Sequence, residues 1–193
     1  MSEAVERPMA AESRGDAPGR QRLEDRRILV VGGGQDDRGL DDAPVGNGRA
    51  MSILFAREGA HVAVADRNIE SAQATVQLAK NGAVAIQTNV AVPGEITSMV
   101  ADATSKLGGL DGLVYNVGIG AGMWFEGSTP EIWDRVFAVN LRGAMLTLQA
   151  ALPVLADGSS IVLISSIASM KAGSRMPSYD ASKAALGGLM RHA

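Results

Sequence analysis

The sequence contains no cysteine, and its only histidines are His61 and His192. Without cysteine there can be no disulfide, thiolate metal ligand or cysteine nucleophile, which fits a reducing compartment, and we expect a cytoplasmic protein. Two histidines so far apart in the sequence also argue against a histidine metal site and against a Ser-His-Asp triad. We therefore predict that no metal is bound.

Long apolar runs and an excess of positive charge are lacking as well. No apolar stretch approaches the roughly 20 residues that a membrane-spanning helix needs, so no membrane partner is expected. The net charge is −3 and no basic stripe occurs, which argues against a nucleic-acid partner. Apolar residues make up 46% of the chain, which is enough for the core of one domain.

The first 26 residues are polar and contain glycine, proline and mixed charges. They lack the apolar segment of a secretory signal. We expect a disordered N-terminal extension over residues 1–26, followed by a single domain over residues 27–193.

Short apolar runs alternate with helical patterns through that domain. The runs at 28–31, 61–66, 83–88, 110–115 and 161–166 predict buried strands, because short, wholly apolar strands are typical of parallel sheets. Helical patterns occupy 50–58, 68–80, 93–107, 130–153 and the residues from 178 onward. This alternation predicts an α/β fold with a doubly wound parallel sheet.

A glycine-rich segment separates the first strand from the first helix. Gly32 begins a run of three glycines, and Gly46, Asn47 and Gly48 stand at the start of the helix. Glycines let the backbone approach a pyrophosphate, and a helix N-terminus offers free N–H groups and a positive dipole end. A tight strand–helix connection would explain the same glycines. The role of the residues inserted between the two clusters, 35–44, does not follow from the sequence.

The second strand ends in an acid, Asp66, which is followed by Arg67. A carboxylate at this position can accept both hydroxyls of an adenosine ribose and repel a 2′-phosphate, which favours NAD over NADP. Arg67 weakens the preference because it could pair with a phosphate. A helix N-cap or a solvated acid is the alternative reading of Asp66.

The last strand ends in two serines, and a tyrosine and a lysine follow on one helix. Tyr179 lies thirteen residues beyond Ser166, and Lys183 lies one helical turn further on the same face. A free tyrosine has a pKa of about 10. An ammonium roughly 4 Å away would favour the phenolate by about 4 kcal/mol before desolvation, or up to about three pKa units. Tyr179 could then act as general acid/base, with Lys183 tuning it and Ser166 holding the substrate oxygen. Simple packing of the tyrosine on the lysine stem is the alternative.

Together these residues resemble the short-chain dehydrogenase/reductase family, from about residue 27 to the end of the chain. The resemblance rests on the glycine-rich turn, Asp66, Asn89-Val90, Asp111, Tyr115-Asn116-Val117-Gly118, Asn140, Ser166, Tyr179 and Lys183. It implies a Rossmann fold and a hydride transfer between NAD and a secondary alcohol or ketone, with NADP less favoured.

The resemblance also implies a role for each matching residue. Tyr179 would be the general acid/base, Lys183 would also bond the nicotinamide ribose, and Asn140 would hold a water in a proton relay. Asn89 and Val90 would flank the adenine. The cofactor site implied in full is Gly32, Gly46, Asn47, Gly48, Asp66, Arg67, Asn89, Val90, Asn116, Gly118, Tyr179 and Lys183.

Three features depart from the family pattern. Gly32 and Gly46 are fourteen positions apart where the usual signature is compact. This resembles a variant with an extended loop, which favours a cyclic or polyol substrate. In that loop the acids Asp36, Asp37, Asp41 and Asp42 would have to point away from the pyrophosphate. Tyr115 stands where the family often has asparagine.

The third departure is that the family normally continues beyond the position of Ala193, with two more strands and a substrate lid. We therefore expect a sheet that is incomplete at its C-terminal edge, and a homo-oligomer if a full-length chain exists. An inactive remnant that binds a cofactor or a partner is one alternative function. An epimerase or dehydratase of the same fold is another.

Overall fold

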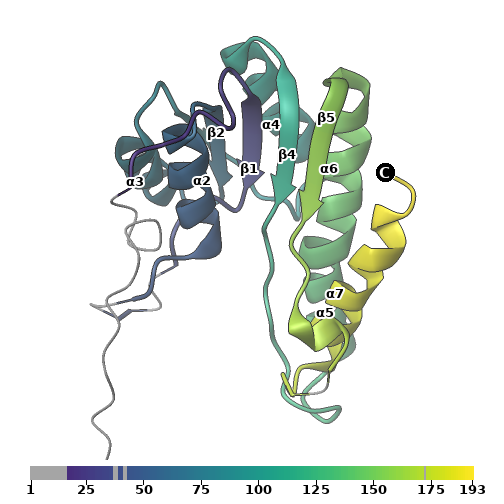
Figure 1. The fold of residues 1–193 in the computed structure, drawn as a ribbon. Helices are drawn as coiled ribbons and strands as arrows, with labels where there is room; N and C mark the ends of the chain where they lie inside the picture. The colour runs from purple at the N-terminus through teal and green to yellow at the C-terminus, as the bar shows by residue number, and fades with distance from the viewer. Residues whose placement is uncertain (1–16, 37–38, 41–42, 172) are drawn as a thin grey trace, which may run out of the picture.

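A computed structural model describes residues 17–36, 39–40, 43–171 and 173–193. Its five strands form one parallel sheet in the order β3-β2-β1-β4-β5 (Figure 1). The strands are β1 (Arg27–Val31), β2 (His61–Asp66), β3 (Val84–Gln87), β4 (Leu110–Tyr115) and β5 (Leu155–Leu163). The predicted parallel, doubly wound sheet is confirmed.

Helices cover both faces of this sheet. On one face lie α2 (Asn47–Arg57) and α3 (Ile69–Ala79), and on the other lie α4 (Pro93–Leu107) and α6 (Gly143–Ala151) (Figure 1). Two more helices, α5 (Pro130–Phe137) and α7 (Pro177–Met190), pack together beside β5. None of the described helices combines the length and the apolar content of a membrane-spanning segment.

The strand β1 explains why the first apolar run is uninterrupted. Ile28 and Val30 pack into the cluster beneath α2 and α3, whereas Leu29 and Val31 pack into the cluster beneath α4 and α6. All four side chains are buried. Successive strand residues point to opposite faces, so a strand covered on both faces has no position for a polar residue.

The structure divides the long helix expected over residues 130–153. After α5 comes a π-helical turn, η1 (Ala138–Arg142), then α6 and a 3₁₀ turn, η2 (Leu152–Val154). The strand β5 then begins at Leu155, six residues earlier than expected, and its pairing with β4 shifts register between Leu110 and Gly112. Gly158, with φ of +77°, lies where the strand departs from regular pairing, a conformation that glycine adopts without strain.

The segment 17–26 also differs from the expectation of a disordered extension. Glu58, at the end of α2, is buried and accepts hydrogen bonds from the backbone N–H groups of Arg20 and Arg22 and from the Arg22 guanidinium. Leu23 packs against the apolar cluster on the α2 side. A buried carboxylate requires such partners, so Glu58 holds the segment in place. Residues 1–16 lie outside the described part of the chain.

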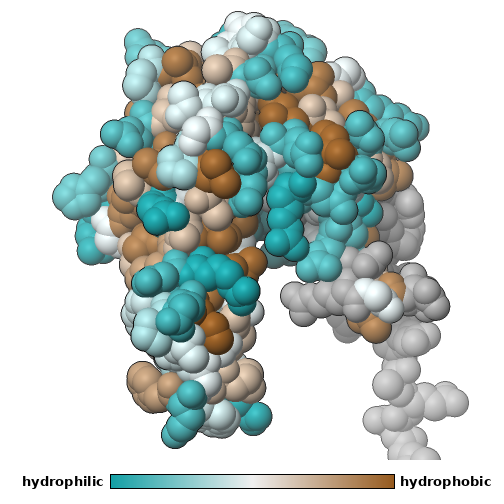
Figure 2. Space-filling model, turned by 180° about the vertical axis from the view of Figure 1, so that it is seen from behind, coloured by the Kyte–Doolittle hydropathy of each residue, from teal (hydrophilic) through white to brown (hydrophobic). Residues whose placement is uncertain are grey.

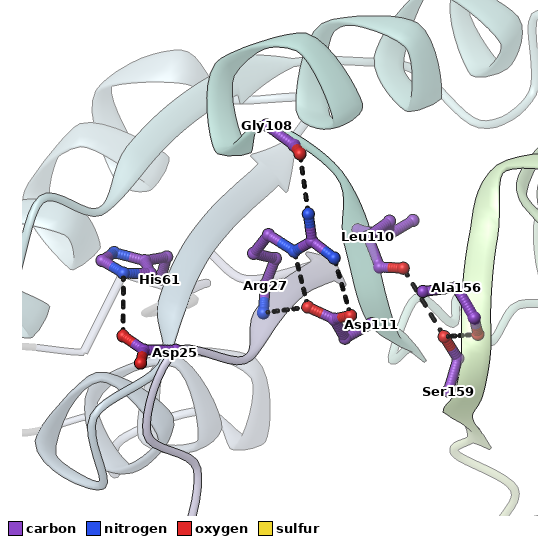
Figure 3. Close-up of polar contacts among 8 residues, drawn as sticks. All are labelled: Asp25, Arg27, His61, Gly108, Leu110, Asp111, Ala156 and Ser159. Atoms are coloured by element: carbon purple, nitrogen blue, oxygen red, sulfur yellow. Dashed lines mark hydrogen bonds and ion pairs between the residues drawn. The ribbon is translucent and has the colours of Figure 1, made fainter.

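A bidentate ion pair fixes the start of β1 against the start of β4 (Figure 3). The Arg27 guanidinium donates to both carboxylate oxygens of Asp111, at 2.6 and 2.8 Å, and its third bond goes to the carbonyl of Gly108 at 2.7 Å. The backbone N–H of Arg27 also donates to Asp111 at 3.0 Å. These hydrogen bonds lower the pKa of the Asp111 carboxyl to about 2.

We predict that Asp111→Asn destabilises the protein by about 2 kcal/mol at pH 7, because a charge-assisted pair is lost. The native pKa lies below the ordinary value of 3.8, so the contribution is full above about pH 4 and disappears as the pH falls towards 2. Urea unfolding at pH 7, 4 and 3 measures it: the gap between the two proteins should narrow only at the lowest pH. A gap that is the same at all three values would contradict the assignment.

Candidate active site

The residues predicted to act together follow the carboxyl ends of the strands, at the lower edge of the sheet in Figure 1. The strand order changes direction between β1 and β4, since β2 follows β1 on one side and β4 lies on the other. Ligands of open α/β sheets bind in the crevice outside such a switch point. The glycine turn follows β1 there, and Asn116 follows β4.

Close backbone contacts hold the glycine turn against α2 and the end of β4. Gly32 has φ of +80°, and its carbonyl oxygen accepts a hydrogen bond of 2.8 Å from the Asn116 carboxamide. A Cβ atom at Gly48 would lie 1.9 Å from that same carbonyl oxygen, so no larger residue fits. Asn116 and the two glycines therefore form one unit that sets where α2 begins.

The N-terminus of α2 leaves backbone donors free. The first bond of this helix runs from the N–H of Ala50 to the carbonyl of Gly46. Within the described residues, the N–H groups of Asn47, Gly48 and Arg49 donate to no other atom. Free N–H groups at the positive end of a helix dipole attract anions, and the predicted Asn47 and Gly48 lie at this end of α2.

Asp66 is at the end of β2, as predicted, and is not a helix cap. The N-cap of α3 is Asn68, whose side chain accepts from the N–H of Ser71. One Asp66 oxygen accepts from the N–H of Gly34 at 2.9 Å and the other from the N–H of Asn68 at 3.1 Å. A carboxylate offers about four lone-pair directions, so both oxygens can still accept from ribose hydroxyls.

An open cleft of about 540 Å³ lies beside Asp66, between the ends of β2 and β3. It is lined by Arg67, Asn68, Glu70, Gln87, Asn89 and Glu95. Two of the predicted residues, Arg67 and Asn89, line this cleft. Val90 does not, because its side chain is buried in the core on the α4 side.

Lys183 is buried between the ends of two strands. Its ammonium donates to the carbonyls of Ile164 at 2.8 Å and Val117 at 3.2 Å, just beyond β5 and β4. A Cβ at Gly118 would lie 2.9 Å from the lysine nitrogen, so this glycine makes room for the side chain. Burial lowers the pKa of the Lys183 ammonium to about 8.

Tyr179 lies on the same helix as that lysine, and Ser166 follows the end of β5. The Lys183 nitrogen lies 6.0 Å from the centre of the Tyr179 ring, so both residues share one face of α7 as predicted. Ser166 precedes a short 3₁₀ turn, η3 (Ile167–Ser169), which contacts α7, and its hydroxyl accepts from the N–H of Ala168 at 3.2 Å. The neighbouring Ser165 donates to the carbonyl of Lys183 at 2.8 Å, which joins the end of β5 to the helix.

Asn140 is fully buried inside the π turn. Its carboxamide accepts from the N–H of Ile119 and donates to the carbonyl of Ile119 and to the hydroxyl of Ser182. Ser182 in turn donates to the carbonyl of Tyr179. Asn140 therefore links the loop after β4 to α7, and both of its donor hydrogens are used.

Tyr115, the residue that departs from the family pattern, supports this π turn. Its phenol is buried and donates to the carbonyl of Val139 at 2.6 Å, and burial raises its pKa above the usual range. A Cβ at Gly143 would lie 2.4 Å from the phenol oxygen. The tyrosine thus fills the space that the glycine leaves and satisfies a carbonyl beside Asn140.

The loop after β4 and the start of α7 form a lobe below the sheet, seen as a column in Figure 2. The backbone N–H of Trp124 donates to the carbonyl of Arg175, and the Arg175 guanidinium lies 5.5 Å from the centre of the Trp124 ring. Met123, Trp124 and Phe125 are exposed in this loop, as are Ile167 and Met170 after β5. Large apolar side chains are therefore exposed in the loop after β4 and in the segment that follows Ser166.

Several residues that position this site could not be recognised from the sequence. Gln35, Ser71 and Ser182 act through hydrogen bonds to distant segments. A polar side chain of these types is common on a protein surface, and nothing in the local pattern indicates its partner. Tyr115 was noticed only as a departure.

The parallel sheet with helices on both faces is a fold of the Rossmann class. Similar proteins show which family within this class the chain belongs to. A family model described as enoyl-(acyl carrier protein) reductase matches residues 44–193. The L-rhamnose 1-dehydrogenase (NAD(P)(+)) of Sphingomonas sp. (strain SKA58) is 32% identical over 88% of this chain and 65% of the relative. The sorbitol dehydrogenase of Cereibacter sphaeroides is 31% identical over 86% and 62%.

A solved structure of a dehydrogenase/reductase from Sinorhizobium meliloti 1021 has a TM-score of 0.78 and 33% identity. The match covers 88% of this chain and 65% of that one. This chain belongs to the short-chain dehydrogenase/reductase family, as the sequence predicted. It spans about two thirds of the length of these relatives.

We predict that the Lys183 ammonium opposes folding at neutral pH, because its native pKa of about 8 lies below the ordinary 10.5. The penalty is present below about pH 8 and disappears as the pH rises to 10.5. Relative to Lys183→Met, the wild-type protein should gain up to about 3 kcal/mol in unfolding free energy between pH 7 and 10.5. Parallel urea titrations of the two proteins test this, and curves with the same pH dependence would contradict it.

Proposed function

We propose that the protein is an NAD-dependent oxidoreductase that moves a hydride between the nicotinamide and a secondary alcohol or ketone. The observation that carries the proposal is the meeting of three features at one sheet edge. These are the free N–H groups of α2, the Asp66 carboxylate, and the Tyr179–Lys183 face of α7. Simple packing of Tyr179 on the lysine would not require an ammonium buried against two strand-end carbonyls.

The residues present fit a nicotinamide dinucleotide. The N–H groups of Asn47 and Gly48 would hold the pyrophosphate, Asp66 the adenosine ribose, and Arg67 and Asn89 the edge of the adenine cleft. When bound, the cofactor supplies the carbon that accepts or donates the hydride. The protein's task is then to orient the substrate carbon and to move one proton.

In the oxidation direction Tyr179 takes the proton of the substrate hydroxyl, while the hydride leaves the carbon that bears this hydroxyl. Ser166 donates a hydrogen bond to the substrate oxygen and holds it beside the phenol. The Lys183 ammonium is held by two strand-end carbonyls and lies beside the Tyr179 ring, on the same face of α7. Asn140 and Ser182 fix the backbone of Tyr179, so the phenol does not have to be ordered during the reaction.

The carboxylate of Asp66 favours NAD over NADP. A 2′-phosphate would come close to this negative charge, and the two backbone N–H groups already bonded to Asp66 keep the carboxylate in place. Arg67 is exposed at the edge of the same cleft and can partly offset the repulsion. We therefore expect a preference that a single substitution can reverse.

Asp66→Asn should weaken NADH binding about tenfold and strengthen NADPH binding, because it removes one acceptor charge and the repulsion of a phosphate. Quenching of tryptophan fluorescence during titration measures both dissociation constants. Asp36→Asn, in the nearby inserted loop, is the matched control for a general change of charge. If both nucleotides bind the wild-type protein and the Asp66 variant equally well, the ribose assignment is wrong.

Tyr179→Phe should abolish turnover, by at least about a thousandfold, and leave the dissociation constant of NADH within about threefold. The phenyl ring preserves the packing, and only the proton-transferring hydroxyl is lost. Substrates to compare are sugars and polyols, as the names of the rhamnose and sorbitol relatives suggest, and apolar cyclic alcohols, as the exposed Trp124 and Phe125 suggest. Residual turnover close to wild type would remove Tyr179 from the mechanism.

A further inference from the structure

The side chain of Gln35 closes the base of the inserted loop (residues 35–44). Its carboxamide nitrogen donates to the carbonyl of Pro44 at 3.0 Å, and its oxygen accepts from the N–H of Gly46 at 2.7 Å. The first residue of the insertion is thereby bonded both to its last residue and to the N-cap of α2. One side chain bridges the two glycine clusters that the insertion separates.

The backbone of Gln35 is anchored just as firmly. Its N–H donates to the Ser71 hydroxyl at 2.5 Å, and that hydroxyl donates to the Gln35 carbonyl at 2.9 Å. The Arg49 guanidinium, from the first turn of α2, donates to the Thr75 hydroxyl and to the Ser71 carbonyl. Helix α3 therefore holds both Gln35 and the start of α2. We call the two hydrogen bonds of the Gln35 carboxamide, to Pro44 and Gly46, the clamp; both of its ends are anchored to α3.

These bonds resemble a helix cap made by a distant residue. In a capping box, a Glu or Gln of the first turn accepts from the N–H of the N-cap residue. Here the N-cap is Gly46, which has no side chain of its own to cap with, and the glutamine that accepts from its N–H lies eleven residues earlier. The bond takes up the N–H of Gly46 and leaves those of Asn47, Gly48 and Arg49 free.

We propose that Gln35 is a positioning residue for the pyrophosphate part of the dinucleotide, an inference that rests on the proposed function. Ten inserted residues would otherwise let the start of α2 move relative to the turn after β1. The Gln35 carboxamide joins the two ends of the insertion. The free N–H groups at the start of α2 therefore keep the position that a compact glycine signature would give them.

The clamp requires a side chain that donates and accepts at the same time. Glutamine does both, and at this length it reaches the carbonyl of Pro44 and the N–H of Gly46 together. A glutamate would keep the bond from Gly46 but could not donate to Pro44, and its charge would lie beside the anion site. An alanine would remove both bonds.

The test uses ADP-ribose and NADH as probes, so the readout is binding and does not depend on a substrate. Four proteins are compared: wild type, Gln35→Ala, a variant in which residues 36–43 are replaced by two glycines, and that shortened variant with Gln35→Ala. Calorimetric titration gives the dissociation constants. Amide hydrogen exchange by NMR reports whether the N–H of Gly46 is protected without any ligand.

We expect Gln35→Ala to weaken ADP-ribose and NADH binding about tenfold and to remove the protection of Gly46. In the shortened loop the same substitution should change binding by less than about threefold, because a short connection no longer needs the clamp. Such rescue separates positioning from a direct contact, since a direct contact would be lost equally in both loops.

Two results would overturn the proposal: unchanged Gly46 protection in Gln35→Ala, or an equal loss of affinity in the long and the short loop. If wild type binds neither probe, the proposed function fails. The exchange measurement then still decides whether the clamp itself exists.

Discussion

The buried ammonium of Lys183 is the constraint on which the arrangement of this site depends. A charge in that position is tolerated only with strong acceptors, and it finds them in the carbonyls of Val117 and Ile164, which follow neighbouring strands. Those two bonds fix α7 against the ends of β4 and β5, and Ser165 adds a third bond from the strand end to the helix backbone. Tyr179, one turn earlier, is positioned by the same bonds. The burial of the Lys183 ammonium therefore has two effects. It lowers the pKa of the lysine, and the hydrogen bonds that it requires fix the position of Tyr179.

The site is built from close approaches that only particular residues permit. Gly118 admits the lysine, Gly48 admits the carbonyl of Gly32, and Gly143 admits the phenol of Tyr115. In each case a Cβ atom would lie within 3 Å of the neighbour. Each of these glycines lies where two segments are in contact. The polar group that approaches the glycine forms a hydrogen bond that joins two segments. Tyr115 can stand where the family often has asparagine for two reasons. Gly143 leaves space for the phenol, and the carbonyl of Val139 accepts its hydrogen bond.

Sequence reasoning predicted the parallel sheet, because wholly apolar strands and regular alternation depend on local composition. It also placed Tyr179 and Lys183 on one helix face, because helical spacing by itself does so. It failed where the outcome depends on distant partners. The π turn around Asn140 depends on Tyr115 and Ile119, and the anchoring of residues 17–26 depends on Glu58. In both cases a buried polar group decided the local structure, and its partner is far away in the sequence.

In the inserted loop, too, hydrogen bonds to residues distant in sequence decide the local structure. An insertion in the glycine-rich turn looks, in sequence, like a reason to doubt the proposed site, since loop length adds conformational freedom where a fixed backbone is needed. The structure removes that freedom at the base of the loop, with one carboxamide between Pro44 and Gly46 and one serine hydroxyl from α3. What the turn requires is a fixed distance between the end of β1 and the start of α2. A short connection supplies that distance through covalent bonds, and a long one can supply it through hydrogen bonds of a single side chain.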